Sequence, residues 1–400
     1  MKLSYTSPKL ITDVEGVECS GLKTEKGGLG IVKCRGKVAG VFTKNKFRAA
    51  PVIVTEENIA NGFLEGIIVN SGNANAYTGK EGIKNAVKMA EMLAEKLECS
   101  PKDVAVSSTG IIGVQLDMEW IGEMVEKVYP KLGNYDQCSW EFAKSITTTD
   151  AFTKQWGLGV DDAVVAGVAK GAGMIAPNMA TMLAYIFTDA NVKRIDELLK
   201  KTVSKTFNSI TVDGDTSTND TVLLISTGSK EVNESKFERA LRCVCSVLAE
   251  MIVADGEGAT KLMRVFVRGA ESDNDAYIAA KTVASSTLVK TALFGCDANW
   301  GRIIAALGYS GVNMDDRITI EVAGCEWRAD EAFGLSKRLR KSTKILDKGR
   351  YVGNRENIMK IMKNDVVEFY IDLGVGNGKS CAVGCDLSYS YVELNSKYTT

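Results

Sequence analysis

Histidine is missing from this sequence of 400 residues. Without it, the chain cannot use the Ser-His-Asp or Cys-His arrangements of many hydrolases. It also lacks the side chain that most often binds catalytic zinc or iron. If the chain is an enzyme, its base must therefore be a carboxylate, an amine or a tyrosine.

Segments that direct a chain to or across a membrane are also missing. No apolar run approaches the ~20 residues that span a bilayer. The first residues, MKLSYTSPKLITDVEG, contain neither the apolar stretch nor the cleavage site of a signal peptide. The ten cysteines are scattered and form no Cys-x-x-Cys pair, which is typical of buried, reduced thiols. These features predict a cytoplasmic protein.

Acidic and basic residues nearly balance, since 49 Lys and Arg against 50 Asp and Glu give a net charge of −1. They form no long run of one sign, so nothing suggests a nucleic acid or a membrane surface as partner. A small polar or zwitterionic ligand remains open. With 45% hydrophobic and 25% charged residues the chain is typical of a globular protein, and its length suits two domains.

The first half of the chain alternates apolar stretches with amphipathic ones, which predicts an α/β fold. Strands are expected at Gly66–Val69 and Val104–Val106, and helices at Ile83–Leu97 and Met118–Val128. The two strands run into the segments NSGNANA and SSTG, which are rich in Gly, Ser and Asn. Turns of this kind leave backbone N–H groups free to face a ligand.

The alternation continues with an apolar strand that ends near Phe187, a helix in NVKRIDELLKKTVSKTFNSI, a strand in TVLLIS and a long helix that ends before Gly256. Beyond about Ser272, a helical stretch is followed by shorter strands and turns. This change predicts a boundary between an α/β domain over residues 1–272 and a smaller α+β domain over 273–400.

Two segments invite a ligand-loop interpretation but depart from the required patterns. In DLGVGNGKS, a phosphate loop would need glycine where Leu373 stands, so a glycine-rich hairpin or bulge is favoured. In DGDTSTND, Asp213–Asp220, a calcium loop would need glycine at Thr218 and glutamate at Leu224. Asx turns or the polar lining of a site are therefore favoured over a metal.

Lys170 is the only ionisable residue in the segment GVAKGAGMIAPNMATM. A lone lysine usually lies on the surface. The segment is too apolar for an exposed loop, so Lys170 is a candidate anchor for a carboxylate, or an amine with a lowered pKa.

Thr181 follows Ala180 where this segment passes into an apolar strand. A threonine in a strand is normally only a β-former. In a chain without histidine, however, a hydroxyl can be activated by making it N-terminal, so that its own α-amine serves as the base. This would require cleavage of the Ala180–Thr181 bond, and a turn rich in Gly and Pro before a rigid strand is a plausible place to strain one peptide.

The segment KGAGMIAPNMATMLAYIFTDA closely resembles the signature of the ornithine acetyltransferases, also called glutamate N-acetyltransferases, of arginine biosynthesis. The resemblance covers nearly the whole chain and includes GVFTKNKFRAAPV, VNSGNANAYTGKEG, SSTGIIGVQLDME, TTDAFTK, TFNSITVDGDTSTND, ADGEGATK, NWGRIIAALGYSG and GCDLSYSYVELNSKYTT. It implies that the chain cleaves itself between Ala180 and Thr181, into an α chain of residues 1–180 and a β chain that begins at Thr181.

The resemblance also implies roles for further residues. Thr181 would be the nucleophile, and Thr109 and Gly110 of STG would form the oxyanion hole. Residues implied to contact substrate, besides Thr181, are Thr148, Lys170, Glu257, Asn395 and Thr400. Lys170 and Glu257 would offer opposite charges to an amino acid that carries a carboxylate and an ammonium group.

The implied reaction transfers acetyl from N2-acetyl-L-ornithine to L-glutamate through an acetyl-threonine, and acetyl-CoA is a possible second donor. The implied fold is an αββα sandwich of the N-terminal-nucleophile type, with a C-terminal domain that contributes substrate-binding residues. No cofactor and no metal are expected, and the α and β fragments are expected to assemble as α2β2. Two alternatives remain: an aminopeptidase or amidohydrolase with the same nucleophile, and a non-catalytic binding protein with an uncut chain.

Overall fold

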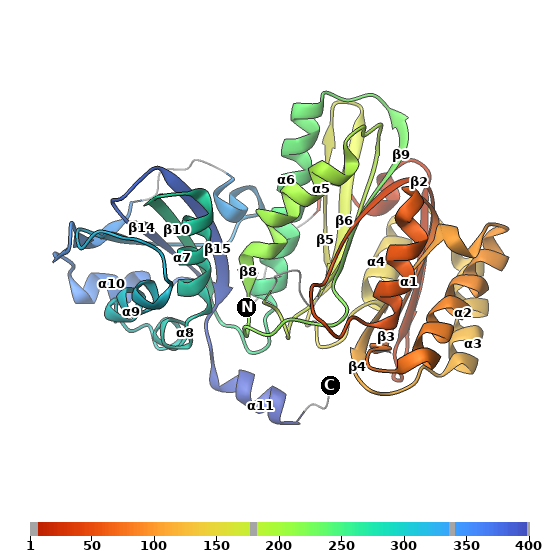
Figure 1. Cartoon of the computed structure of the whole chain (residues 1–400), viewed down its shortest axis with the longest axis horizontal. Helices are drawn as coiled ribbons and strands as arrows, with labels where there is room; N and C mark the ends of the chain where they lie inside the picture. Colours follow the sequence, from red (N-terminus) through yellow and green to blue (C-terminus); the bar gives the residue numbers. More distant parts are fainter. Residues whose placement is uncertain (1–6, 177–181, 336–340, 398–400) are drawn as a thin grey trace. The chain divides into compact units, whose positions relative to one another are not determined.

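The computed structural model describes residues 7–176, 182–335 and 341–397. The chain divides into two compact units (Figure 1). The N-terminal unit comprises Thr6–Ser204 and Asp215–Leu248. The C-terminal unit comprises Lys205–Gly214 and Ala249–Tyr398.

The N-terminal unit is built on an eight-stranded sheet of order β4-β3-β2-β9-β7-β6-β5, with β1 paired to β2. Its strands are β1 (Val17–Lys23), β2 (Gly28–Phe42), β3 (Phe63–Asn73), β4 (Val104–Ile111), β5 (Lys154–Val160), β6 (Ala163–Lys170), β7 (Leu183–Ala190) and β9 (Thr221–Lys230). The helices of this part of the chain are α1 (Ala50–Asn58), α2 (Gly79–Leu97), α3 (Met118–Val128), α4 (Asp136–Ser145), α5 (Ile195–Ser204) and α6 (Glu234–Ala254), which continues into the C-terminal unit.

The long strand β2 lets this sheet fold over itself. Its residues from Gly28 pair with β3, whereas those from Lys37 to Phe42 pair with β9. One apolar cluster then joins both halves of the sheet, with side chains of β2 and β3 packed against those of β6 and β7, among them Val32, Ile67, Val168 and Tyr185. The sheet therefore forms two layers with a shared core.

Helices cover the outer faces of the two layers. A second apolar cluster joins the opposite face of β2, β3 and β4 to α1, α2 and α3. On the other side, a Cβ built at Gly167 of β6 would lie 2.6 Å from Ile186 of β7 and 2.8 Å from Leu248 of α6, so α6 lies directly on β6 and β7. The expected αββα layering is confirmed, and Figure 1 shows these helices on either side of the strands.

The sequence explains where several helices begin. Asp117 precedes α3, and its carboxylate accepts a hydrogen bond of 3.0 Å from the backbone N–H of Trp120. Such an N-cap satisfies a donor that the first helical turn leaves unpaired. Pro51 lies in the first turn of α1, where its missing N–H costs nothing. Helix α3 spans the expected residues, and α2 begins earlier than its first expected apolar residue because its first turn is polar.

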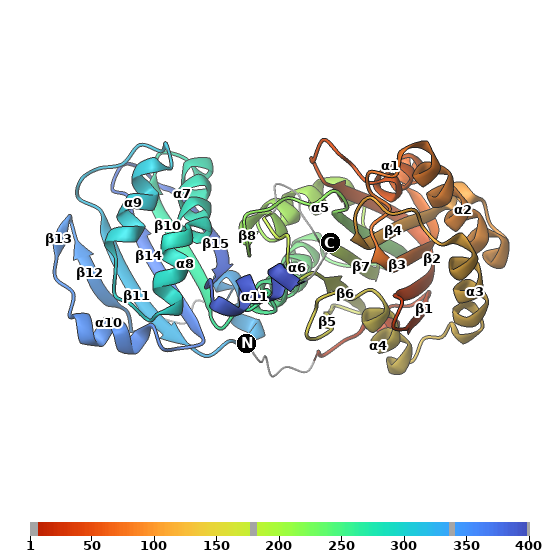
Figure 2. The same cartoon turned by 90° about the horizontal axis from the view of Figure 1, so that it is seen from below.

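The C-terminal unit contains a seven-stranded sheet of order β13-β12-β11-β14-β10-β15-β8. The strands are β8 (Ile210–Thr211), β10 (Leu262–Ala270), β11 (Thr319–Cys325), β12 (Thr343–Asp347), β13 (Arg350–Tyr351), β14 (Val366–Asp372) and β15 (Gly378–Cys385). Its helices are α7 (Asp273–Ser285), α8 (Thr287–Phe294), α9 (Gly301–Tyr309), α10 (Arg355–Ile361) and α11 (Tyr389–Lys397). Helices α7, α8, α9 and α10 share one apolar cluster with the sheet, and Figure 2 shows α7 and α8 lying along its strands.

The structure assigns some segments differently from the sequence-based expectation. Strand β10 lies in the second sheet between β14 and β15, although it precedes the boundary expected near Ser272. The segment DLGVGNGKS is not a simple hairpin, because β14 and β15 pair with β10 on opposite sides rather than with each other. A register shift lies opposite the end of this segment, but on β10, between Arg268 and Ala270, rather than within the segment itself. Sequence patterns show that a strand is buried but not which neighbours it has.

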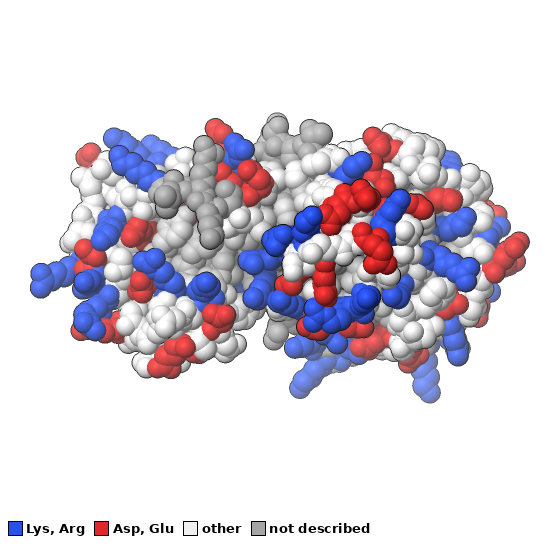
Figure 3. Space-filling model, turned by 90° about the horizontal axis from the view of Figure 1, so that it is seen from above, with Lys and Arg blue, Asp and Glu red and all other residues white. Residues whose placement is uncertain are grey.

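Among the described residues, no helix is long and apolar enough to cross a membrane. On the face that Figure 3 shows, basic and acidic side chains intermingle, as the net charge of −1 suggests.

Candidate active site

The ends of β3 and β4 form the first part of the candidate site. These strands are parallel, with Ser71 opposite Thr109 and Gly72 opposite Gly110. Gly110 has a φ of +134°, and a Cβ there would lie 2.3 Å from the carbonyl carbon of Gly72. Only glycine permits this approach. The predicted oxyanion-hole residues therefore lie at a strand end where two backbone segments are in close contact.

Asn219, just before β9, links the loop that follows β3 to strand β4. Its side-chain N–H groups donate to the carbonyl of Ala74 at 2.6 Å and to the carbonyl of Ser108 at 2.9 Å. The Ser108 hydroxyl in turn donates to Asn70 Oδ1 at 2.6 Å. Asn70, Ser108 and Asn219 are all buried polar residues, so each of these hydrogen bonds satisfies a group that water cannot reach.

Lys170, the last residue of β6, brings together three of the predicted site residues. Its ammonium group donates to the hydroxyl of Thr109 at 3.1 Å and to that of Thr148 at 2.9 Å. Lys170 is only 4% exposed, as the apolar segment around it predicted. A buried cation with hydroxyl partners is suited to hold an anionic group of a ligand.

Asp150 holds the backbone around both Thr148 and Lys170. Its Oδ2 accepts a hydrogen bond of 2.9 Å from the N–H of Thr148, and its Oδ1 accepts one of 2.7 Å from the N–H of Gly171. Lys154 Nζ lies 2.6 Å from Oδ1, and both side chains of this ion pair are fully buried. Burial alone would raise the pKa of Asp150, but the ammonium groups of Lys154 and Lys170 outweigh it and lower the pKa.

Lys23 adds another positive charge to this site. Its ammonium group donates to the hydroxyl of Ser71 at 2.9 Å and to the carbonyl of Thr147 at 2.5 Å. Burial lowers its pKa; the Lys170 ammonium lowers it further, and Asp150 opposes both. The cationic groups around Asp150 favour a ligand with a carboxylate or a developing negative charge.

Asp220 lies where β7 begins. Its Oδ1 accepts a hydrogen bond of 2.8 Å from the N–H of Met182, which directly precedes the strand. Burial raises the pKa of Asp220 well above its ordinary value, against the lowering effects of the Met182 N–H and the Lys170 ammonium. The same Lys170 therefore acts electrostatically on both buried carboxyl groups, Asp150 and Asp220.

Two predicted site residues pair within the C-terminal unit. Asn395, on α11, donates from Nδ2 to Glu257 Oε2 at 2.8 Å. Helix α11 begins three residues after Asp386, whose Oδ1 accepts from the N–H groups of Thr260 and Lys261. The chain after α6 and the C-terminal helix are thus connected, which brings together two residues that are far apart in the sequence.

The remaining predicted residues, Ala180, Thr181 and Thr400, lie outside the described residues. The strand predicted after them is present, since β7 is buried along its whole length.

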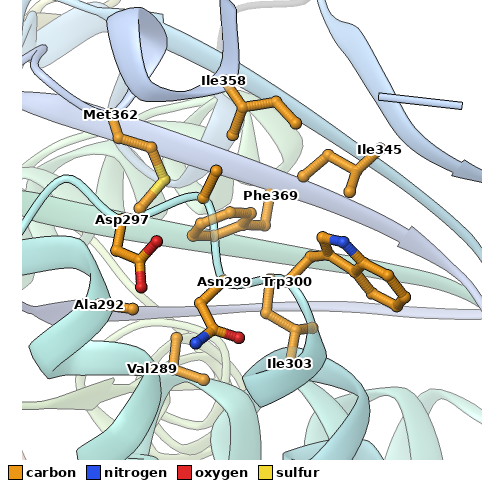
Figure 4. A pocket seen from close by; sticks show the side chains of 11 residues that line it. Val289, Ala292, Asp297, Asn299, Trp300, Ile303, Ile345, Ile358, Met362 and Phe369 are labelled. Carbon is orange, nitrogen blue, oxygen red and sulfur yellow. The ribbon is translucent and has the colours of Figure 1, made fainter. Parts of the chain in front are cut away.

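Neither candidate ligand loop forms a metal site within the described part of the chain, where no group of His, Cys, Asp or Glu could hold a metal ion. Residues of the second loop instead form polar contacts, because Asn45 Nδ2 and the Thr43 hydroxyl donate to the carbonyls of Thr216 and Ser217. A shallow pocket lies in the C-terminal unit, where apolar side chains line it together with Asp297 and Asn299 (Figure 4). No predicted site residue lines it.

Sequence reasoning missed the roles of Asp150, Lys154 and Asp220. Asp150 and Lys154 lie in TTDAFTK, where their spacing of four resembles a surface ion pair. Asp220 closes the DGDTSTND segment, which was interpreted as polar site lining without a role for any single residue. Their burial depends on tertiary packing, which the local pattern does not reveal.

Comparison with known proteins places these residues in a family context. Residues 14–400 match the ArgJ family. The arginine biosynthesis bifunctional protein ArgJ of Archaeoglobus fulgidus is 52% identical over 393 residues, which cover 98% of this chain and 100% of that protein. The glutamate N-acetyltransferase of Methanosarcina mazei is 44% identical over 400 residues, 98% of each chain. A crystal structure of ArgJ from Bacillus halodurans matches with a TM-score of 0.47 and 39% identity over 55% of this chain and 100% of that one.

Proposed function

Because this chain belongs to the ArgJ family, we propose that it is a glutamate N-acetyltransferase of arginine biosynthesis that cleaves itself between Ala180 and Thr181. It transfers acetyl from N2-acetyl-L-ornithine to L-glutamate. The observation that carries the proposal is the pair of hydrogen bonds from Lys170 to Thr109 and Thr148. They join three motif residues, from separate parts of the chain, in one buried cationic site.

The proposed reaction has two half-reactions. Thr181 Oγ attacks the acetyl carbonyl carbon of acetylornithine while its own α-amine takes the hydroxyl proton. The Thr109 hydroxyl and the Gly110 N–H stabilise the negative charge that develops on the carbonyl oxygen. Ornithine leaves with the proton, and the acetyl group stays on Thr181 Oγ. The amine of glutamate then attacks this ester, which gives N-acetylglutamate and restores the hydroxyl.

Ammonium and carboxylate side chains support recognition of the charged groups of an amino acid. Lys170 and Lys23 provide ammonium groups for the substrate carboxylate in the N-terminal unit. Glu257, held by Asn395, provides a carboxylate for a substrate ammonium group in the C-terminal unit. Thr148 and Thr400 are proposed as further substrate contacts. Ornithine and glutamate each carry a carboxylate and an ammonium group at the α-carbon, and ammonium and carboxylate side chains of this kind can bind them.

The order of strands in the sheet supports a lasting association of the two fragments. β5 and β6 precede the proposed cut, whereas β7 and β9 follow it, and β7 pairs with β6 along its length. On its far side β9 pairs with β2, which again precedes the cut. The strands of one fragment therefore flank those of the other, and we propose that the fragments remain together and pair further into α2β2.

Two measurements test this function. On denaturing electrophoresis the chain should give fragments of 180 and 220 residues, the second beginning Thr-Met-Leu. Initial rates at several concentrations of acetylornithine and glutamate should give the parallel double-reciprocal lines of ping-pong kinetics. A chain that stays intact and is nevertheless fully active would contradict the mechanism. If acetylornithine is consumed equally fast without glutamate, the protein is a hydrolase instead.

Two finer points belong to the same proposal. The reaction as written requires no cofactor, and an assay with acetyl-CoA as sole donor decides whether the enzyme also makes N-acetylglutamate from it. A cytoplasmic location is proposed as well, and fractionation of cells that produce the protein tests it.

A further inference from the structure

Among the described residues, one oxygen of the Asp220 carboxyl group accepts a hydrogen bond and the other accepts none. Oδ1 accepts the hydrogen bond from Met182 N–H at 2.8 Å. Oδ2 is buried and, within the described part of the chain, has no hydrogen-bond partner. The Thr43 hydroxyl is near but donates its proton to the Ser217 carbonyl at 2.6 Å. Buried polar atoms are almost always paired, so an unpaired carboxyl oxygen next to a reacting segment requires an explanation.

The hydrogen bond to Met182 ties this carboxyl to the proposed cleavage point. The nitrogen that donates it belongs to the peptide bond between Thr181 and Met182, so only the carbonyl carbon of Thr181 separates it from the Thr181 Cα. Strand pairing holds both partners in register, because Leu183 lies opposite Thr221 in the parallel pair of β7 and β9. The carboxyl group of Asp220 and the backbone of Met182 are thus held together by a hydrogen bond and by the pairing of β7 with β9.

We propose that Asp220 is the proton carrier of self-cleavage. This inference rests on the proposed function, because it assigns a residue to the cleavage step. No histidine is present to do this work, and the α-amine of Thr181 cannot, since it is part of the bond that breaks. Burial raises the pKa of Asp220, so its carboxylate is a stronger base than an exposed one, while the positive charge of Lys170, on β6, opposes the loss of that carboxylate form.

The proton returns within the same step. The Asp220 carboxylate takes the proton of the Thr181 hydroxyl as the oxygen attacks the carbonyl carbon of Ala180. The C–N bond between Ala180 and Thr181 then breaks, and Asp220 gives the proton to the departing nitrogen. Ala180 is now joined to Thr181 through an ester. Water hydrolyses this ester to the free hydroxyl and the carboxylate of Ala180, and the new amine takes up the released proton.

The test compares Asp220→Asn with a matched control, Asp189→Asn. Asp189 is also buried, lies on β7, and accepts a backbone hydrogen bond of 2.7 Å from Val164. Both variants keep an oxygen for the backbone N–H but cannot accept a proton. Each full chain is made by cell-free synthesis and its cleavage is followed with time by denaturing electrophoresis at several pH values. Asp220→Asn should slow cleavage by about 10²–10⁴-fold, the usual contribution of a general base.

Further outcomes separate this role from a structural one. The pH dependence of the cleavage rate should disappear in Asp220→Asn and persist in Asp189→Asn. The Tm of Asp220→Asn should stay close to that of the wild type, because the Met182 N–H keeps its acceptor. Cleavage of Asp220→Asn at the wild-type rate would overturn the assignment. If that variant does not fold, Asp220→Glu decides: restored cleavage supports the proposal and absent cleavage overturns it. A wild-type chain that is never cleaved would instead overturn self-processing itself.

Discussion

The substitution Gly110→Ala tests how closely the proposed oxyanion hole depends on the contact between β3 and β4. A Cβ at Gly110 would lie 2.3 Å from the carbonyl carbon of Gly72 and 2.5 Å from the nitrogen of Asn73. Both are backbone atoms, which cannot rotate away as a side chain can. Ordinary contact begins at 3.4 Å, so the two strand ends must separate by about 1 Å.

The expected effect on turnover follows from this displacement. Moving a catalytic group by about 1 Å costs about 10²-fold in rate, and losing one oxyanion donor costs about 10²–10³-fold. We therefore expect kcat of Gly110→Ala to fall by about 10²–10³-fold, which corresponds to about 2.7–4 kcal/mol of transition-state stabilisation. KM should change less, because the ammonium groups proposed to bind the substrate carboxylate are not displaced directly.

Gly113→Ala is the matched control for this prediction. Gly113 has a φ of +83°, so alanine there is strained in the same sense, but no atom lies within 4 Å of the added Cβ. Gly113→Ala should keep most of its activity. Rates are divided by the cleaved fraction, measured by mass spectrometry, so that slow processing is not mistaken for slow turnover. A wild-type kcat in fully folded Gly110→Ala would refute the proposed oxyanion hole.

The contacts of Gly110 also decide which substitution tests its role. The contacts with Gly72 and Asn73 show that any Cβ already collides with backbone, so a larger side chain would disturb the strands as well as the site. Alanine is the smallest change that tests the role.

Further predictions concern the cations, the buried carboxylate and the cut sheet. Lys170→Met should lower kcat/KM by at least about 10²-fold, as expected when a charge-assisted contact is lost, whereas exposed Lys127→Met should not, in the same steady-state assay. Asp150→Asn should lower the free energy of unfolding by about 3–5 kcal/mol at neutral pH, because Lys154 loses its buried partner. Since the pKa of Asp150 is lowered, its contribution is complete above about pH 5 and is lost as pH falls further, so denaturant titrations of the two proteins should converge in acid. The fragments should co-elute on native gel filtration and separate only in denaturant; separation in native buffer would contradict the interleaved sheet.

The sequence predicts the local elements of this fold well. The periodicity of α3 identifies both of its ends, and the zero-histidine count correctly directs attention away from the common triads. The sequence does not predict that β10 belongs to the second sheet. Arg264 and Arg268 interrupt the apolar residues of β10, and the strands that bury it, β14 and β15, come about a hundred residues later.

The same limit applies to the candidate site. Lys170 could be predicted because a charged residue in an apolar segment is conspicuous. Asp150 and Lys154 could not, since a pair at this spacing is usually an exposed ion pair, and here both side chains are fully buried. Their partners, the N–H groups of Thr148 and Gly171, become neighbours only when the chain after α4 and the end of β6 meet.

The interleaved sheet gives the proposed cut a physical rationale. Lys170 ends β6 before the cut, and Asp220 leads into β9 after it, yet the ammonium group of Lys170 acts on the carboxyl group of Asp220. Each proposed fragment therefore holds only part of the charge arrangement of the site. Because β7 is bonded to β6 on one side and to β9 on the other, breaking one peptide bond just before β7 leaves the hydrogen bonds on both sides in place. Cleavage can thus release a new amine at the site without loss of the backbone pairing that positions Lys170 and Asp220.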